Sequence, residues 1–308
     1  MKILILGAGG QVGTDLRPLL LARGATLHCF DIKDAPAGLQ DGVAWSQGDI
    51  TDKAAVEGLV GDVQPDVIYH LAAMLSATGE LNPQAAYRVN MEGTYNVLEC
   101  ARERNVSQVM FASTIAVFGP GLESPVPDDV PLLPATMYGV TKVAGELLGT
   151  YYHRKYGVDF RGVRFPGLIN AGIPGGGTTD YALYMFVDGI QKGAYECFVG
   201  PESTVPMMYM ADGLRAMVEL SEAPRSSLTR CIYNIGAVSP TAAEFADAVR
   251  ARVPGVKLTF KADPKRQAIL DSWPAAVDDT CARSDWGWKH QFDLDAMSDD
   301  LVEKIRAM

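Results

Sequence analysis

The chain lacks the features that mark secreted, metal-binding or membrane-spanning proteins. Its five cysteines are odd in number, scattered and nowhere spaced as Cys-x-x-Cys, which argues against a disulfide framework and a zinc site. The one strongly apolar run near the start, residues 3–6, is far too short for a signal peptide or a membrane span and leads directly into glycines. We therefore expect reduced thiols, no metal site and a cytoplasmic protein.

Basic patches are also missing. The 27 lysines and arginines are outnumbered by 37 aspartates and glutamates, so the net charge is −10, and no basic cluster offsets it locally. Such a surface repels nucleic-acid phosphates and anionic lipid, so we expect neither a nucleic-acid nor a membrane partner. With 308 residues and 48% hydrophobic composition, the chain can nevertheless form a sizeable globular core.

The first half of the chain alternates β-branched runs with amphipathic stretches. The runs predict six strands, at 2–6, 26–30, 43–47, 67–70, 109–112 and 160–165. The stretches predict helices at 11–23, 52–60, 84–104 and 138–156. Crossovers of this length are typical of an α/β protein with a doubly wound parallel sheet, the Rossmann arrangement, which the apolar run at 231–235 would rejoin as a seventh strand.

A glycine-rich turn, GAGGQVG at 7–13, follows the first predicted strand and opens the first predicted helix. Its glycines let backbone N–H groups and the helix N-terminus approach a pyrophosphate, although a purely structural turn would look the same. Asp31 ends the second predicted strand, where a carboxylate accepts both adenosine ribose hydroxyls and repels a 2′-phosphate. This context favours NAD over NADP, with Lys33 as a nearby cation that would accommodate such a phosphate.

Further cofactor contacts are predicted where other strands end. Asp49 and Ile50 would lie near the adenine, and the run 71–73 would form a floor of small residues, with ordinary strand-end packing as the alternative. The predicted cofactor set is Gly7, Gly10, Gln11, Val12, Gly13, Asp31, Asp49, Ile50, Leu71, Ala72, Ala73, Asn90, Ser113, Tyr138, Lys142, Pro166 and Leu168.

The composition changes after Pro166, where a Gly/Pro/Thr-rich loop at 173–180 is followed by short mixed elements. We therefore expect an NAD-binding Rossmann domain at 1–165, with a return segment near 211–237. A smaller C-terminal substrate-binding region is expected at 166–210 and 238–308.

Tyr138 and Lys142 are four residues apart in a predicted helix and so share one of its faces. The ammonium can then approach both the phenol and a bound ribose, and it favours the phenolate. A free tyrosine titrates near ~10, so basicity near pH ~8 requires roughly 2.7 kcal/mol of phenolate stabilisation, which the ammonium and an oxidised nicotinamide would supply together. Tyr151 and Lys155 repeat the spacing, but about 220° around and roughly 20 Å along the helix, which excludes them from the same site.

The first pair is preferred because STIAVFG at 113–119 supplies hydroxyls at the carboxyl edge of the sheet. Thr114 is the candidate to hydrogen-bond a reacting oxygen, and a turn or capping role is the alternative for it and for Ser113. His70, among apolar neighbours on the fourth predicted strand, is expected to be a satisfied structural histidine rather than a ligand or base.

Taken in this order, the glycine turn, the strand-end hydroxyl and Tyr-x-x-x-Lys resemble the extended short-chain dehydrogenase/reductase family over essentially the whole chain. More specific segments look like the L-threonine 3-dehydrogenases of that family: PATMYGVTK at 134–142, FPGLI at 165–169, PGGGTTDYA at 174–182, PMMYM at 206–210 and DSWP at 271–274. Thr114 stands where many sugar-nucleotide relatives carry serine, and Phe118 where they often carry tyrosine. Neither departure blocks the chemistry, because threonine keeps a hydroxyl.

The resemblance implies oxidation of the L-threonine β-hydroxyl to 2-amino-3-oxobutyrate, with NAD as hydride acceptor and no metal. Tyr138 would take the hydroxyl proton, Thr114 would orient the oxygen and Lys142 would anchor the ribose. The expected substrate contacts are Ser76, Thr114, Tyr138, Gly177, Thr178, Thr179, Asp180 and Trp273. A helix cap is the alternative role for Asp180, and a core or interface anchor for Trp273.

Two further expectations concern assembly and partners, and the dimer comes from the resemblance alone. A homodimer would form through the outer faces of the helices at 84–104 and 138–156, where Val140, Ala144, Leu147 and Tyr151 make an apolar stripe that would equally suit packing on the sheet. A ligase that consumes the unstable product is a candidate downstream partner.

The main alternative is an NAD-dependent sugar-nucleotide epimerase or dehydratase, which would share the cofactor turn and the Tyr/Lys pair. Against it, VPMMYM precedes Asp212 where such enzymes commonly show an Arg-rich, His-containing segment, and the second half lacks an obvious arginine pair for a diphosphate. A non-catalytic NAD-sensing scaffold would be expected to lose Tyr138, Lys142 or the Thr114 hydroxyl, and all are present.

Overall fold

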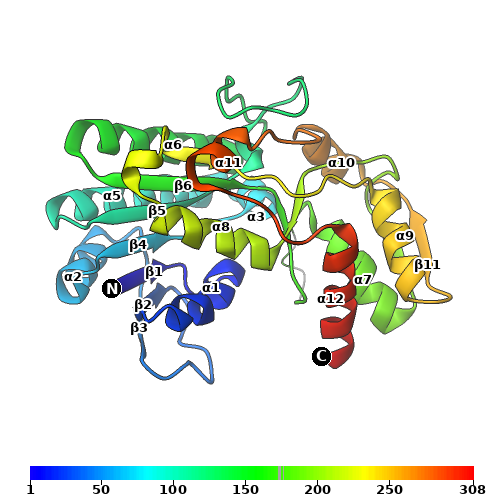
Figure 1. Cartoon of the computed structure of the whole chain (residues 1–308), viewed down its shortest axis with the longest axis horizontal. Helices are drawn as coiled ribbons and strands as arrows, with labels where there is room; N and C mark the ends of the chain where they lie inside the picture. Colours follow the sequence, from blue (N-terminus) through cyan, green and yellow to red (C-terminus); the bar gives the residue numbers. More distant parts are fainter. Residues whose placement is uncertain (173–174, 176) are drawn as a thin grey trace. The chain divides into compact units, whose positions relative to one another are not determined.

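A computed structural model of the chain describes residues 1–172, 175 and 177–308 (Figure 1). The chain divides into two compact units. The first comprises Met1–Thr114, Met137–Arg164 and Leu214–Tyr233, and the second comprises Ile115–Thr136, Phe165–Gly213 and Asn234–Met308. Residues 173, 174 and 176 of the predicted loop at 173–180 lie outside the described residues.

The first unit is built on a seven-stranded sheet in the order β10-β6-β5-β4-β1-β2-β3. Its strands are β1 (Lys2–Leu6), β2 (Thr26–Asp31), β3 (Val43–Gln47), β4 (Val67–His70), β5 (Gln108–Thr114), β6 (Asp159–Phe165) and β10 (Ile232–Asn234). The pairs β1–β2, β2–β3, β1–β4 and β4–β5 are parallel. Strands β2 and β3 are added on one side of β1 and β4 on the other, so the strand order reverses between β1 and β4. Ligands of such folds bind beyond the carboxyl ends of the strands at this switch point.

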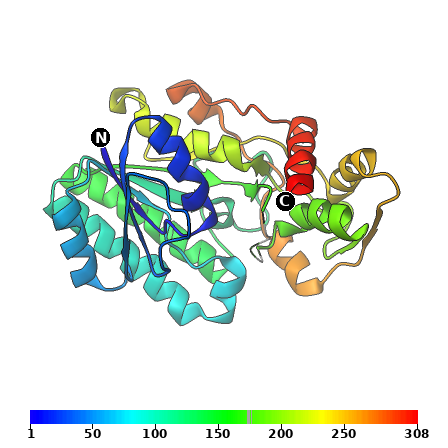
Figure 2. The ribbon, with the colours of Figure 1, turned by 90° about the horizontal axis from the view of Figure 1, so that it is seen from below.

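Helices cover both faces of this sheet. Figure 2 shows α1 (Gln11–Ala22) and α8 (Met210–Glu222) over one face, and α2 (Lys53–Val63), α5 (Gly93–Glu103) and α6 (Met137–Tyr156) over the other. A sheet covered on both sides needs strands that are apolar throughout, and the side chains from Ile3 to Leu6 in β1 are fully buried. The predicted α/β Rossmann fold is confirmed.

Most strands predicted from sequence are confirmed, and the helix predicted at 84–104 is confirmed with a π-helical turn within it. The stretch 84–104 is divided into α4 (Pro83–Tyr87), a π-helical turn (Arg88–Glu92) and α5, and α3 (Ser76–Leu81) precedes it without having been predicted. Gly93 begins α5 directly after the π-helical turn. A side chain at Gly93 would place its Cβ 2.5 Å from Ile50 Cδ1, so the helix approaches Ile50 closely at the one residue without a side chain.

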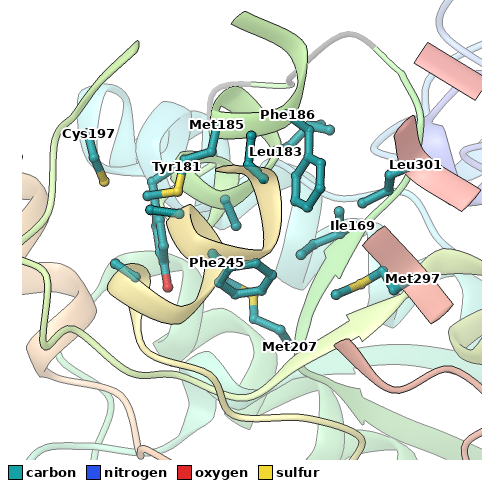
Figure 3. Close-up of a cluster of buried hydrophobic side chains, with 14 of the residues drawn as sticks. Ile169, Tyr181, Leu183, Met185, Phe186, Cys197, Met207, Phe245, Met297 and Leu301 are labelled. Carbon is teal, nitrogen blue, oxygen red and sulfur yellow. The ribbon is translucent and has the colours of Figure 1, made fainter. Parts of the chain in front are cut away.

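The second unit has its own hydrophobic core (Figure 3). Its elements are a short helix (Ile115–Val117), β7 (Gly167–Ile169), α7 (Asp180–Lys192), β8 (Ala194–Cys197), β9 (Met207–Tyr209), α9 (Ala242–Arg252), β11 (Lys257–Phe260), α10 (Pro264–Asp271), α11 (Thr280–Trp286) and α12 (Leu294–Ala307). Helices α7, α9 and α12 pack against one another around Tyr181, Phe186 and Phe245. Two parallel strand pairs, β7–β9 and β8–β11, complete this unit.

In the described part of the chain, no helix is both long enough and apolar enough to span a membrane.

Candidate active site

The glycine turn joins β1 to α1 at the switch point of the sheet. Gly7 has φ +85°, and a Cβ there would lie 2.5 Å from the Ala72 backbone nitrogen. A Cβ on Gly13 would lie 2.7 Å from both Gly7 O and Ala8 Cα. Neither position tolerates a side chain, because backbone atoms cannot move aside as a flexible side chain can. The turn is therefore a tight backbone cradle at the N-terminus of α1.

The N-terminus of α1 fits an anionic ligand. Its N-cap is Gly10, which has no side chain to accept from the N–H groups of the first turn, and there is no acidic residue in that turn. A helix beginning in this way presents backbone donors and the positive end of its dipole to an anion such as a pyrophosphate. The residues present thus fit a dinucleotide: the N-terminal turn from Gln11 to Gly13 would face its phosphates, whereas the Gly10 N–H already donates to Gly7 O at 3.1 Å.

Asp31 ends β2 beside this turn and is 9% exposed. Its carboxylate accepts the Gly9 N–H at 2.8 Å and the Lys33 N–H at 3.0 Å, so it is fixed in the loop. The Lys33 ammonium donates to Gly9 O at 3.2 Å, which places the cation at the turn rather than leaving it unpaired. A fixed carboxylate here suits the hydroxyls of an adenosine ribose and disfavours a 2′-phosphate.

Arg17 is a site residue that the sequence reading missed. It lies on α1, is 4% exposed, and donates from Nη1 to Ala8 O at 3.2 Å. The next peptide nitrogen, Gly9 N, donates to Asp31, so the Ala8–Gly9 peptide is held at its carbonyl by Arg17 and at its N–H by Asp31. The spacing Gly13 to Arg17 was the available signal, because residues four apart share one helix face.

The other predicted cofactor residues of this unit have varied surroundings. Asp49 accepts the Thr51 N–H at 2.9 Å and so shapes its own turn, while Ile50 is buried beneath Gly93. Leu71 and Ala72 lie against the Gly7 backbone, where they enclose the turn from the β4 side. Ala73 is partly exposed and Ser76, a predicted substrate contact, is 6% exposed at the start of α3.

Tyr138, Lys142 and Thr114 come together at the carboxyl end of β5. Tyr138 and Thr114 are joined by a side-chain hydrogen bond. Lys142 is 3% exposed, donates to Ala112 O at 2.7 Å and lies 4.7 Å from the Phe111 ring centroid and 5.7 Å from that of Tyr138. The second Tyr/Lys pair is elsewhere on α6, with Tyr151 51% exposed.

The pKa values of Tyr138 and Lys142 are shifted in the direction opposite to the one that would favour a phenolate and an ammonium. Burial raises the pKa of Tyr138 to about 12, and the hydrogen bond with Thr114 opposes the rise only in part. Burial lowers the pKa of Lys142 to about 8, against the opposing charge of Glu146. The phenol is thus less acidic than a free tyrosine in the protein alone, so the phenolate stabilisation required near pH 8 is larger than the sequence suggested.

Asn90 connects the π-helical turn to α6. It lies in the π-helical turn, accepts the Met74 N–H at 2.8 Å, and donates to Met74 O at 3.0 Å and to Thr141 Oγ1 at 3.0 Å. Thr141 in turn donates to Tyr138 O at 2.8 Å. Asn90 therefore fixes both the loop after β4 and the start of α6.

His70 is buried, as predicted for a structural histidine, but it is not fully satisfied. Its Nε2 pairs with Thr94 Oγ1 at 2.8 Å, while within the described residues Nδ1 has no hydrogen-bond partner. Burial, followed by the charge of Lys142, lowers the pKa of His70 to about 3, so the ring is neutral.

The remaining predicted residues belong to the second unit. Pro166 is buried, Leu168 lies in β7, and Thr178 is 4% exposed. Asp180 begins α7 and accepts the Gly177 N–H at 2.9 Å, so its carboxylate helps to order the turn before the helix that follows Thr179. Trp273 packs partly buried against the core of this unit. No group of three or more potential metal ligands occurs among the described residues.

Comparisons with known proteins agree on one family. The model of the NAD dependent epimerase/dehydratase family matches residues 3–236. The mitochondrial L-threonine 3-dehydrogenase of Bos taurus is 43% identical over 297 residues, covering 95% of this chain and 79% of that protein. The solved L-threonine dehydrogenase from Clostridium difficile is 39% identical, with a TM-score of 0.95 and coverage of 99% and 98% of the two chains. A monomeric L-threonine 3-dehydrogenase from a metagenome is 39% identical, with a TM-score of 0.94 and coverage of 99% of each chain.

Proposed function

The chain belongs to the NAD dependent epimerase/dehydratase family, and from this premise we propose that it oxidises L-threonine at the β-hydroxyl to 2-amino-3-oxobutyrate. Two observations carry this proposal. The chain is similar over nearly its full length to proteins named L-threonine dehydrogenases, and Thr114, Tyr138 and Lys142 come together at the end of β5 in the sheet whose β1 leads into the glycine turn. Bound NAD supplies the acceptor for the hydride that leaves the hydroxyl-bearing carbon.

Tyr138 is proposed as the base that removes the hydroxyl proton. A pKa of about 12 leaves only about one phenolate in ten thousand at pH ~8, so charge must favour the phenolate before turnover. Lys142, four residues later on the same face of α6, is the nearby side-chain cation that does so. Thr114 holds the phenol by a hydrogen bond and is placed to orient the substrate oxygen.

The substrate's carboxylate and ammonium need polar partners. We retain the predicted contacts Ser76, Gly177, Thr178, Thr179, Asp180 and Trp273 as part of the proposal. Asp180 already accepts the Gly177 N–H, which favours a role in shaping the loop over direct binding of the ammonium. Substitution of Thr178 by valine should raise the KM for L-threonine without raising the KM for NAD if the hydroxyl contacts the substrate.

NADH formation by the purified chain tests the function directly. NAD would be supplied with L-threonine, D-threonine, 3-hydroxybutyrate or a UDP-sugar, and NADP would replace NAD in a parallel series. Reduction of NAD by L-threonine but not by the other substrates is the expected result. Conversion of the UDP-sugar with tightly retained NAD, and no oxidation of any amino acid, would assign the chain to the epimerase and dehydratase reactions of the same family.

We also propose a homodimer formed by the outer faces of α5 and α6. Val140, Leu147 and Tyr151 are 45%, 64% and 51% exposed, so this part of the predicted stripe faces away from the sheet. Tyr95 on α5 is 45% exposed and would extend the same apolar surface. The metagenome relative is described as monomeric, so the assembly must be measured on this chain. Sedimentation at one protomer mass would refute the dimer.

A cytoplasmic location and a downstream ligase complete the proposal. The location rests on the composition of the chain, and the Bos taurus relative is named as mitochondrial. The ligase follows from the instability of the product. Fractionation of the source cells and co-purification with a ligase activity would test the two statements separately.

A further inference from the structure

A buried ion pair lies one helical turn along α6 from Lys142. Glu146 on α6 is 4% exposed and Arg164 on β6 is 6% exposed. Arg164 Nε donates to Glu146 Oε1 at 3.0 Å and Arg164 Nη2 donates to Oε2 at 2.8 Å, so the contact is bidentate. Ser113 Oγ donates to the same Oε1 at 2.5 Å. The carboxylate is therefore fixed by a guanidinium from one strand and a hydroxyl from the next.

The position of Glu146 on α6 relates it to the catalytic pair. Tyr138, Lys142 and Glu146 are spaced four residues apart, so all three lie along one stripe of the helix. Ser113 is the residue immediately before Thr114 on β5. One buried carboxylate thus touches the strand end that carries Thr114 and follows Lys142 by one helical turn.

The charges around the Lys142 ammonium explain why a carboxylate is useful there. Lys142 Nζ donates to Ala112 O at 2.7 Å, and Ser113, the next residue of β5, donates to Glu146, so adjacent residues of one strand hold the ammonium and the carboxylate. Neutral His70 on β4 and the Tyr138 phenol on α6 also lie near Lys142, and Arg164 on β6 pairs with Glu146. Among these groups the carboxylate is the one that favours the charged ammonium. A carboxylate and a guanidinium are costly to bury, and an apolar pair would often serve stability equally well.

We propose that Glu146, held in place by Arg164 and Ser113, is a positioning residue whose buried carboxylate compensates the charge of the Lys142 ammonium. The inference deepens the proposed function, on which the role of Lys142 rests. Loss of the carboxylate would remove the negative charge that pairs with Arg164 and that favours the charged form of Lys142. Lys142 would then lose its proton at a lower pH, and with it the charge that favours the Tyr138 phenolate.

The same strand offers a matched control. Arg161 on β6 is 4% exposed and pairs with Asp159 through Nη2 to Oδ2 at 2.6 Å. It also donates to Leu220 O at 2.7 Å and Ala223 O at 2.6 Å, next to α8 rather than α6. Arg161 and Arg164 differ by an odd number of residues and so point to opposite faces of the sheet. Asp159→Asn therefore breaks an arginine–carboxylate pair away from Lys142, with a carboxylate that is less buried than Glu146 and also lies 3.7 Å from Arg225 Nε.

The test is a titration of Lys142 in the full chain labelled with carbon-13 at the lysine Cε, with the resonance assigned by its loss in Lys142→Met. Glu146→Gln should lower the midpoint by about one pH unit, a tenfold change in the proton dissociation constant. Asp159→Asn should leave the midpoint at its wild-type value. Glu146→Asp, which keeps the negative charge, should have a Lys142 midpoint close to the wild-type value.

A folding defect is handled by a second variant. Glu146→Gln with Arg164→Met removes both buried charges, and it should fold while its Lys142 midpoint stays below the wild-type value. An unchanged midpoint in both Glu146 variants, an equal shift in Asp159→Asn, or failure of both variants to fold would overturn the proposal. The titration uses no substrate, so an absence of turnover with L-threonine would refute the proposed function alone.

Discussion

A methyl group added to the cofactor turn should lower the free energy of unfolding, whereas a methyl group added to an exposed helix position should raise it. A Cβ at Gly13 would lie 2.7 Å from Gly7 O and from Ala8 Cα, both backbone atoms of the turn. Overpacking of this kind costs about 1–3 kcal/mol, and the gain from replacing a helical glycine by alanine offsets up to about 1 kcal/mol of it. We therefore expect Gly13→Ala to lower the free energy of unfolding by about 1–2 kcal/mol.

The same substitution at Gly58 is the control. Gly58 lies within α2 and has no neighbouring atom within 4 Å of an added Cβ. Gly58→Ala should raise the free energy of unfolding by about 0.5–1 kcal/mol, because alanine loses less conformational freedom than glycine on folding. The two variants should thus differ by about 2–3 kcal/mol in stability although they add the same methyl group to the same kind of element.

Urea denaturation and NAD titration measure the two consequences. The methyl group at Gly13 must displace the N-terminus of α1, so the N–H groups proposed to hold the pyrophosphate move and the Kd for NAD should rise by about tenfold or more, which is ~1.4 kcal/mol. Gly58→Ala should leave the Kd unchanged. A Gly13→Ala protein that matches Gly58→Ala in both stability and NAD affinity would refute the cofactor turn as described.

Three further predictions concern single residues. Asp31→Asn should reduce the ratio of kcat/KM for NAD to that for NADP by roughly tenfold to a hundredfold, because hydrogen bonds to a charged group contribute about 1.5–3 kcal/mol; an unchanged ratio would remove Asp31 from cofactor selection. Arg17→Met should raise the KM for NAD with kcat and the KM for L-threonine unchanged, since it frees the carbonyl of Ala8; steady-state kinetics in which all constants stay at wild type would leave Arg17 a packing role only. Burial lowers the pKa of His70 to about 3, below the ~6.5 of an unfolded histidine, so its neutral ring stabilises the folded state above pH ~6.5 and this contribution is lost as the pH falls towards 3. The difference in unfolding free energy between the wild type and His70→Gln should therefore change over this range by up to about 1.4 kcal/mol per pH unit, and a constant difference would contradict the assignment.

The sequence was most informative where a periodic pattern is confined to one element. The first strand, β3 and β4 were predicted with the bounds that the structure has, because a doubly covered parallel sheet requires short, continuous apolar runs. The Tyr138 and Lys142 pair was found in the same way, since residues four apart on a helix must share a face.

Long-range contacts were not predictable from local pattern. Gly93, next to the π-helical turn, packs closely against Ile50, which is 43 residues away in sequence, and no local pattern predicts this contact. The burial of Glu146 and Arg164 depends on the packing of α6 on β5 and β6, which the local sequence does not report. The stripe from Tyr138 through Lys142 to Glu146 was the available signal, because it places the carboxylate on the same face as the catalytic pair.

The pKa of Tyr138 was also outside the reach of spacing alone. Four-residue spacing indicates that an ammonium is near, but the direction of the shift depends on how deeply the phenol is buried. Burial prevails and raises the pKa to about 12, so a phenolate at pH ~8 requires roughly 5 kcal/mol of compensation. The Lys142 ammonium, which Glu146 helps to keep charged, and the positive charge of an oxidised nicotinamide are the contributions available for this.

The most direct test of the proposed mechanism is NADH formation from L-threonine by wild type and Tyr138→Phe, measured beside the Kd of each protein for NAD. Phenylalanine keeps the ring but removes the proton acceptor, so turnover should be lost almost entirely while the Kd for NAD stays within about threefold, or ~0.7 kcal/mol, of wild type. Turnover by Tyr138→Phe close to the wild-type rate would contradict the assignment of Tyr138 as the base.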